Sequence, residues 1–262
     1  MFLQHFNLTD HPFMETPPLK WILHDPRMDE ALARLKFFRD QGQLALVGGQ
    51  TGVGKSTLLR LFINALPQNR YQPIYLHLTQ VNANAFLRLI VTALGENPKM
   101  GKDRLFIQII ERIRQNEKCT LLIIDEAHML EPRALTDLRL LISAGETEPA
   151  LKIILCGQET LKQTLKRASH ADLVQRICVR FWFKGLTRDQ TKAYIDNRVK
   201  MANGSERIFQ SEAIHLIHDY TSGIPRQVNN VATACLINAA SKGQEFITDD
   251  LVNQAMNEFI LS

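Results

Sequence analysis

The chain has 262 residues, of which 45% are hydrophobic and 22% charged, and its formal net charge is +4. This composition is typical of a globular protein with one or two domains and excludes a low-complexity chain. No run of about 18 apolar residues is present to span a bilayer. Residues 1–5 lack the layout of a signal peptide, so we expect a cytoplasmic protein without membrane attachment. The small positive charge is compatible with a polyanionic partner but does not require one.

Four cysteines are scattered along the chain: Cys119, Cys156, Cys178 and Cys235. No two of them have the C-x-x-C spacing of a metal or redox motif, and three lie in or beside apolar runs typical of strands. We therefore predict that all four are reduced, buried thiols.

The first segment with a clear pattern is residues 6–13, where aromatic side chains, turn formers and a proline predict a packed extended arm rather than a helix. Farther along, Asp25 followed by Pro26 is a favourable helix start, and apolar residues then recur at helical spacing. The expected helix leads into the apolar run 44–47, which predicts a buried strand.

Residues 49–56 match the pattern G-x-x-x-x-G-K-[ST] without deviation. The three glycines of this pattern let the backbone turn tightly and point N–H groups at phosphates, and a helix that begins near Lys55 adds its positive dipole end. Lys55 would hold the β- and γ-phosphates, and the Ser56 hydroxyl would bind Mg²⁺. The strand before this stretch and the amphipathic run after it argue against a chance glycine-rich turn. The arm at residues 6–13 would either cover the adenine or only pack on the core, and both remain open.

Two helices and a strand are expected before the next motif. Residues 73–78 alternate like a strand, and residues 83–94 have helical spacing. A polar, basic break then precedes another helix. The cations at this break, Lys99, Lys102 and Arg104, are candidates for DNA phosphate contacts, with an ordinary solvated loop as the alternative.

Residues 120–126 form a continuous apolar run that ends in two carboxylates, as expected of a buried parallel strand. Asp125 fits the acid that holds magnesium, directly or through water. Glu126 is placed to orient and polarise the water that attacks the γ-phosphate. The alternative, an acidic strand end followed by a solvated turn, is disfavoured by the upstream phosphate-binding pattern.

A helix at residues 135–142 is followed by a break at residues 145–149 and by another buried strand, which ends at Gln158. Gln158 can sense the γ-phosphate, or it can merely cap the next helix. Arg176, at a helix-to-strand turn, is the leading candidate for an arginine finger that completes a neighbouring subunit's site, with Arg180 second. A structural ion pair for either arginine is also open.

From Gly185 onward the pattern contains helices only, over residues 189–201, 211–220, 225–240 and 248–260. Arg226 follows a rigid Gly-Ile-Pro turn at a helix start, where its guanidinium can reach a bound phosphate. An exposed arginine without a partner is the alternative. We expect an N-terminal arm and first helix at 1–40, a P-loop core at 41–184 and a helical lid at 185–262.

These motifs, in this order, resemble those of the AAA+ ATPases. The likeness is greatest to the ExeA/GspA-type ATPase domain and its relatives MuB and TnsC, which regulate DNA transposition, and it covers nearly the whole chain. The narrower resemblance is carried by residues 6–8, 12–13, 125–128, 138–141, 154–161, 175–177 and 223–226.

The resemblance implies an α/β fold, with a five-stranded parallel sheet sandwiched by helices and a small all-helical lid. It also implies ATP hydrolysis with Mg²⁺, ATP-dependent oligomers in ring or filament form, and nucleotide at subunit interfaces, with Arg176 acting in trans. The expected catalytic residues are Lys55, Glu126, Gln158 and Arg176. The expected nucleotide contacts are Gly49, Gln50, Thr51, Gly52, Val53, Gly54, Lys55, Ser56, Thr57, Asp125 and Arg226, with Ser56 and Asp125 on the metal.

Two departures from the family pattern bear on function. The strand end 156–158 lacks the Asn, Ser or Thr of the commonest sensor. A secretion ATPase of this group would also continue into a membrane segment and a wall-binding domain, and the sequence stops at Ser262. We therefore expect an ATP-dependent regulator of transposition that assembles on duplex DNA and meets a transposase and a targeting protein. The alternative is an ATPase that remodels a protein partner in secretion or envelope assembly. A small phosphotransferase is disfavoured, because Glu126 beside Asp125 suits water activation.

Overall fold

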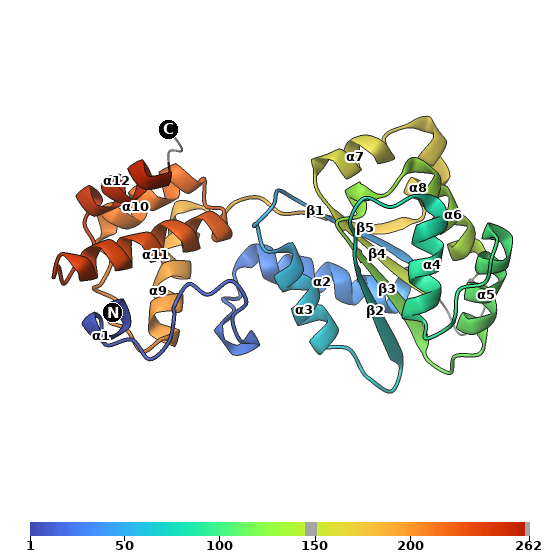
Figure 1. The fold of residues 1–262 in the computed structure, drawn as a ribbon, viewed down its shortest axis with the longest axis horizontal. Helices are drawn as coiled ribbons and strands as arrows, with labels where there is room; N and C mark the ends of the chain where they lie inside the picture. The colour runs from blue at the N-terminus through green and yellow to red at the C-terminus, as the bar shows by residue number, and fades with distance from the viewer. Residues whose placement is uncertain (145–150, 260–262) are drawn as a thin grey trace. The chain divides into compact units, whose positions relative to one another are not determined.

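A computed structural model describes residues 1–144 and 151–259 of the chain (Figure 1). The expected break at residues 145–149 and the last residue of the expected final helix, Ile260, lie outside this range. The described chain forms two compact units, which are considered separately. One comprises Arg27–Thr51 and Lys55–Phe183, and the other comprises Met1–Pro26, Gly52–Gly54 and Lys184–Ser262.

The first unit is built on a five-stranded parallel sheet in the order β2-β3-β4-β1-β5. The strands are β1 (Leu44–Gly48), β2 (Tyr71–His77), β3 (Cys119–Asp125), β4 (Leu151–Gly157) and β5 (Ile177–Trp182). This confirms the predicted α/β architecture. The three middle strands, β3, β4 and β1, are almost completely buried, which is why they read as continuous apolar runs.

Helices flank the sheet on both faces. They are α2 (Pro26–Gln41), α3 (Lys55–Asn64), α4 (Ala83–Ala93), α5 (Lys102–Arg114), α6 (Pro132–Ala144), α7 (Glu159–Leu165) and α8 (Ala171–Gln175), with short 3-10 turns at Ala127–Met129 and Ala168–His170. Successive strand residues point to opposite faces. Leu44 and Leu46 join one core with residues of α4 to α8, whereas Ala45 and Val47 are buried on the opposite face.

The second unit contains the helices of the C-terminal third, α9 (Arg188–Met201), α10 (Ser211–Thr221), α11 (Pro225–Ser241) and α12 (Asp249–Phe259), as expected. It also contains α1 (Phe2–His5) and the 3-10 turn Leu19–Trp21. Phe6, Leu8, Phe13 and Trp21 share one hydrophobic core with these helices. The backbone N–H of Thr9 donates to the carbonyl of Ala202 at 2.9 Å. The N-terminal arm is therefore non-helical after His5 and is packed within this unit.

The prediction for the cysteines is wrong in part. All four thiols are free, and Cys156 and Cys235 are buried. Cys178 is exposed because β5 is an edge strand, where alternate side chains face away from the core. Cys119 is half-buried because it is the first residue of β3. The apolar context of these residues did not reveal their position in the sheet.

Among the described residues, no helix combines the length and the apolar character needed to cross a bilayer.

Candidate nucleotide and magnesium site

The phosphate-binding loop connects β1 to α3. Its first glycine, Gly49, has φ +146° and donates its N–H to the carbonyl of Gly157 at the end of β4, 3.2 Å away. Gly52 and Gly54 also have positive φ angles, +83° and +110°, which side chains with a Cβ rarely adopt. The glycines are therefore required by the backbone path of the loop. This path ends where α3 begins, at Lys55, as predicted.

Lys55 is buried and its ammonium group lies within the loop. Nζ donates to the carbonyls of Gly49 and Gln50, at 2.9 Å each. A buried ammonium inside a loop of backbone N–H groups is a site for anionic oxygen. Among the other loop residues, Val53 is buried, Thr51 and Ser56 are exposed, and Thr57 is half-buried.

The structure brings Ser56 and Asp125 together, as expected of two ligands to one metal. The Ser56 hydroxyl donates to Oδ2 of Asp125 at 3.3 Å. Both groups are hard oxygen donors of the kind that Mg²⁺ binds, and Mg²⁺ usually keeps several waters and takes few protein ligands. These two residues therefore fit Mg²⁺.

Asp125 is an ionised carboxylate in a buried position, with a side chain that is 2% exposed. Burial alone would raise its pKa, but hydrogen bonds from the Tyr75 hydroxyl, the Cys156 thiol and the backbone N–H of Glu126 outweigh this effect and hold the pKa below its ordinary value. The Tyr75 hydroxyl donates to the same Oδ2 atom that Ser56 contacts. His77 Nδ1 lies 3.7 Å from that atom.

Sequence reasoning missed Tyr75 and His77, although both lie on the predicted second strand. Their positions follow from the parallel register of β2 and β3, which aligns Tyr75 with Ile123 and His77 with Asp125. The only signal in the sequence was a polar residue at every second position of an otherwise apolar run. That signal identifies a face of the strand but not the neighbour that it contacts.

Glu126 follows Asp125 in the left-handed backbone region, with φ +57°, which is uncommon for a residue with a side chain. Its carboxylate accepts a hydrogen bond from Gln158 Nε2 at 3.4 Å and lies 3.3 Å from His128 Nδ1. Gln158 directly follows β4 and precedes α7, but its side chain makes no capping hydrogen bond. The alternative that Gln158 only caps the helix is therefore wrong. Its side chain instead contacts the Glu126 carboxylate.

The two arginine-finger candidates lie on one short segment. Arg176 is half-buried at the C-terminal end of α8, directly before β5. Arg180 lies within β5, and its guanidinium donates to the carbonyl of Val174 at 2.9 Å. Arg180 is thus oriented by a backbone carbonyl of α8, and Arg176 stays the leading candidate because of its position at the helix-to-strand turn.

Arg226 begins α11 after Pro225, as predicted. Its backbone N–H donates to the carbonyl of Gly52 at 3.2 Å, within the unit that contains both residues. A Cβ added at Gly52 would lie 2.6 Å from the Cβ of Arg226, so this approach requires glycine. The Arg226 guanidinium lies 3.1 Å from Glu15 in the N-terminal arm, so it has an ion-pair partner.

The basic break is only partly a free cationic surface. Lys102 is the first residue of α5, and its Nζ lies 2.8 Å from Oδ1 of the buried Asp137 in α6. Lys102 therefore also neutralises a buried carboxylate, but its side chain is 48% exposed, and its role as a DNA contact stays a prediction. Lys99 and Arg104 are exposed.

Comparisons with known proteins bear on the fold that carries this site. Residues 39–165 match the family described as "AAA domain". The chain is 29% identical to General secretion pathway protein A of Aeromonas hydrophila over 98% of its length, and it spans 48% of that relative.

Among solved structures, it is similar to Cdc6p from Pyrobaculum aerophilum, with a TM-score of 0.73 and 17% identity over 97% of this chain and 72% of that one. It is also similar to the Aeropyrum pernix ORC1 protein in complex with DNA, with a TM-score of 0.71 and 15% identity over 95% and 68% of the two chains. The chain therefore has the AAA+ P-loop fold, in which a five-stranded parallel sheet between helices is followed by further C-terminal helices.

Proposed function

We propose that this protein binds Mg²⁺ with ATP and hydrolyses the nucleotide. The observation that carries the proposal is the buried Lys55 ammonium in the loop beside the contact of Ser56 with the ionised Asp125. Bound Mg²⁺ would neutralise charge on the phosphates and on the leaving group. Lys55 and the loop N–H groups would hold the phosphates, and Ser56 and Asp125 would hold the metal.

In this proposal, Glu126 polarises the attacking water, and Gln158 links the Glu126 carboxylate to the region of the γ-phosphate. The 3.4 Å contact between their side chains supports the pairing. Arg176 completes the site of a neighbouring subunit in an ATP-dependent oligomer. The position of Arg176 at the end of α8, after a short helix and before an edge strand, supports this role.

The biological function that we propose is regulation of DNA transposition, through nucleotide-dependent assembly on duplex DNA and contact with a transposase and a targeting protein. The resemblance to MuB and TnsC and the net charge of +4 support this function. Similarity to an ORC1 protein that was solved in complex with DNA is compatible with it. Lys99 and Arg104 are the proposed phosphate contacts, since target capture needs affinity without base readout.

The second candidate is a partner-remodelling ATPase of secretion or envelope assembly. The specific observation in its favour is the 29% identity to General secretion pathway protein A, which extends over 98% of this chain. The nucleotide chemistry would be the same in both functions. They differ in whether ATP controls binding to DNA or to a protein.

Fluorescence anisotropy of a labelled DNA duplex separates the two functions. The protein is titrated in ATP, in ADP and without nucleotide over a salt series, with Lys55→Ala as the control. ATP-dependent binding that weakens steeply with salt and disappears in Lys55→Ala is the expected result. In a Lys99→Ala/Arg104→Ala variant that still hydrolyses ATP, the affinity for the duplex should depend less steeply on salt concentration. Absence of ATP-dependent binding at low salt would contradict the transposition proposal and favour the protein-partner function.

A further inference from the structure

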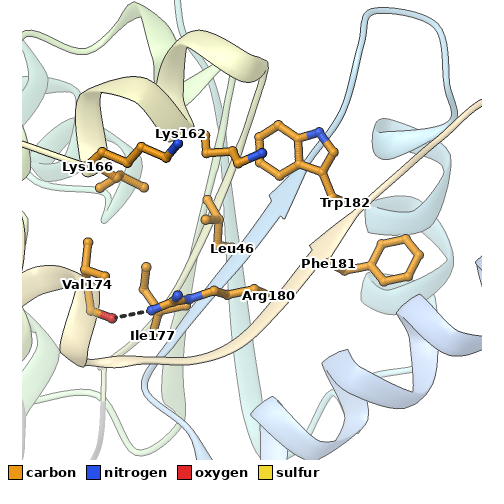
Figure 2. Close-up of a pocket in the computed structure, with 9 residues that line it drawn as sticks. Leu46, Lys162, Lys166, Val174, Ile177, Arg180, Phe181 and Trp182 are labelled. Carbon is orange, nitrogen blue, oxygen red and sulfur yellow. Dashed lines mark hydrogen bonds between the residues drawn. The ribbon is translucent and has the colours of Figure 1, made fainter.

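A cavity of about 340 Å³ opens in the α/β unit (Figure 2). It is lined by residues of β1, β5, α7 and α8 and of the turn that follows α7. Its lining residues lie outside the proposed nucleotide and magnesium contacts, and one of them, Arg180, is the second candidate for the arginine finger. Its volume lies at the lower end of the range for sites that bind small molecules or anchoring side chains.

The interior of the cavity is apolar. Leu46 of β1 forms its centre, and Leu165, Val174 and Ile177 add further aliphatic surface. Leu46, Leu165 and Ile177 also belong to the main hydrophobic core, so the cavity wall is part of a packed structure. A preformed apolar cavity favours a ligand that buries apolar surface within it.

The rim of the cavity is cationic. Lys162, Lys166 and Arg180 line it, and none of the described lining residues is a carboxylate. Lys162 pairs with Glu159 at 3.1 Å, but both side chains are about half exposed, so this pair is weak. Arg180 is oriented by its hydrogen bond to the Val174 carbonyl, which leaves other guanidinium N–H groups to contact a ligand (Figure 2). The rim therefore complements negative charge.

Trp182 provides a rigid aromatic wall. Lys162 Nζ lies 5.0 Å from the centre of its ring, within the range of a cation–π contact. The indole also lies against Gly48, where an added Cβ would come within 1.9 Å of the ring. Tyr and Trp walls of this kind, together with Arg, are enriched among the residues that dominate protein interfaces.

We propose that this cavity binds an acidic segment of a partner protein, which inserts a leucine or aromatic side chain and places carboxylates on the lysine and arginine rim. The charge complementarity and the apolar interior together select this occupant. Duplex DNA would supply the negative charge, but its bases are stacked and its phosphates cannot fill an apolar cavity. The inference goes beyond the proposed ATPase function and does not depend on it.

The test uses the full chain and a fluorescein-labelled peptide of sequence Asp-Glu-Leu-Phe-Glu-Asp-Leu-Glu, with anisotropy as the readout. One comparison peptide has serine in place of leucine and phenylalanine, and another has lysine in place of the acids. We expect saturable binding of the first peptide and at least about tenfold weaker binding of both others, since each lacks one half of the complementarity. If the serine peptide binds as tightly as the first peptide, the proposal is overturned, because charge attraction alone would then account for the binding.

Two variants connect binding to the cavity. Lys162→Glu/Lys166→Glu reverses the rim and should weaken binding at least about tenfold. Lys36→Glu/Lys118→Glu makes the same change of charge at exposed positions outside the cavity and should leave binding within about twofold. Val174→Phe fills the cavity and should weaken binding in a protein that keeps its thermal unfolding transition. Unchanged binding in either cavity variant would overturn the proposal.

Two other occupants are tested in the same experiment. A labelled DNA duplex whose binding is lost in Lys162→Glu/Lys166→Glu, with no peptide binding, would overturn the proposal in favour of nucleic acid. Concentration-dependent self-association that the same variant abolishes, again without peptide binding, would overturn it in favour of a second copy of this chain.

Discussion

The hydroxyl of Ser56 lies 3.3 Å from a carboxylate oxygen of Asp125, although the two residues are 69 positions apart in the sequence. Ser56 is in the first turn of α3, and Asp125 is the last residue of β3. The carboxyl ends of parallel strands meet at one edge of a sheet, so the loop after β1 and the end of β3 become neighbours there. This pair is the structural basis of the proposed magnesium site.

Ser56→Ala should reduce the effect of Mg²⁺ on ATP binding. The substitution removes one of the two protein oxygens proposed to hold the metal, and the loop glycines and Lys55 stay in place. We expect the ratio of ATP affinities with Mg²⁺ and with EDTA to fall about tenfold, as measured with a fluorescent ATP analogue. The affinity in EDTA serves as the internal control. A ratio equal to that of the unmodified protein would remove Ser56 from the metal site.

Glu126→Gln should abolish hydrolysis while ATP binding is retained. An amide of the same shape cannot take a proton from water, so the rate should fall by about 10² to 10⁴. Gln158→Ala should have a smaller effect, about tenfold, because Gln158 acts through its contact with Glu126. Glu159→Gln, an exposed change at the next position, is the matched control in a phosphate-release assay. If Gln158→Ala hydrolyses ATP at the control rate, the pairing has no catalytic role.

Lys102→Met should destabilise the fold. It leaves Asp137, whose side chain is 6% exposed, without its ion-pair partner. The cost should be about 1–3 kcal/mol in the free energy of unfolding, toward the lower end because the Lys102 side chain is 48% exposed. Lys99→Met is the control and should change stability by less than about 0.5 kcal/mol. Urea unfolding measures both, and equal stability of the two variants would show that the pair contributes nothing.

The stability of the α/β unit should decrease as the pH falls through the titration of His170. Burial, together with the nearby Arg167, lowers the pKa of this histidine below its ordinary value of 6.5. The unfolded chain therefore binds more protons than the folded chain between the two pKa values, and stability is lost as the pH falls through that window.

His170→Leu should flatten this dependence, since it removes the titrating group. Urea unfolding at a series of pH values between about 5 and 8 measures the slope. His215→Gln, at an exposed position on α10, should leave the slope unchanged. A slope that is the same in His170→Leu and in the unmodified protein would show that other groups cause the acid sensitivity.

Much of the fold and of the candidate site follows from local sequence. The strand 44–47, the loop at 49–56 and the helix that begins at Lys55 are dictated by apolar patterning and by glycine positions that need positive φ. The apolar run before Asp125 likewise predicted a buried parallel strand. These features depend on interactions between residues close in the chain, so the sequence alone could predict them.

Other features depended on which strands became neighbours. The register of β2 and β3 places Tyr75 beside Asp125. The packing of α5 on α6 brings Lys102 into an ion pair with Asp137. The exposed Cys178 lies on a strand whose edge position no local pattern reveals.

The sequence by itself determined the nucleotide-binding loop, the strand that carries the two acids and the helical character of the C-terminal third. Only the tertiary structure decided the partners of these groups, including the contact of Gln158 with Glu126 and the cavity beside Trp182. The physical reason is that periodicity and backbone preferences act over a few residues. Contacts between distant segments depend instead on strand order, register and helix packing, which the whole chain decides together.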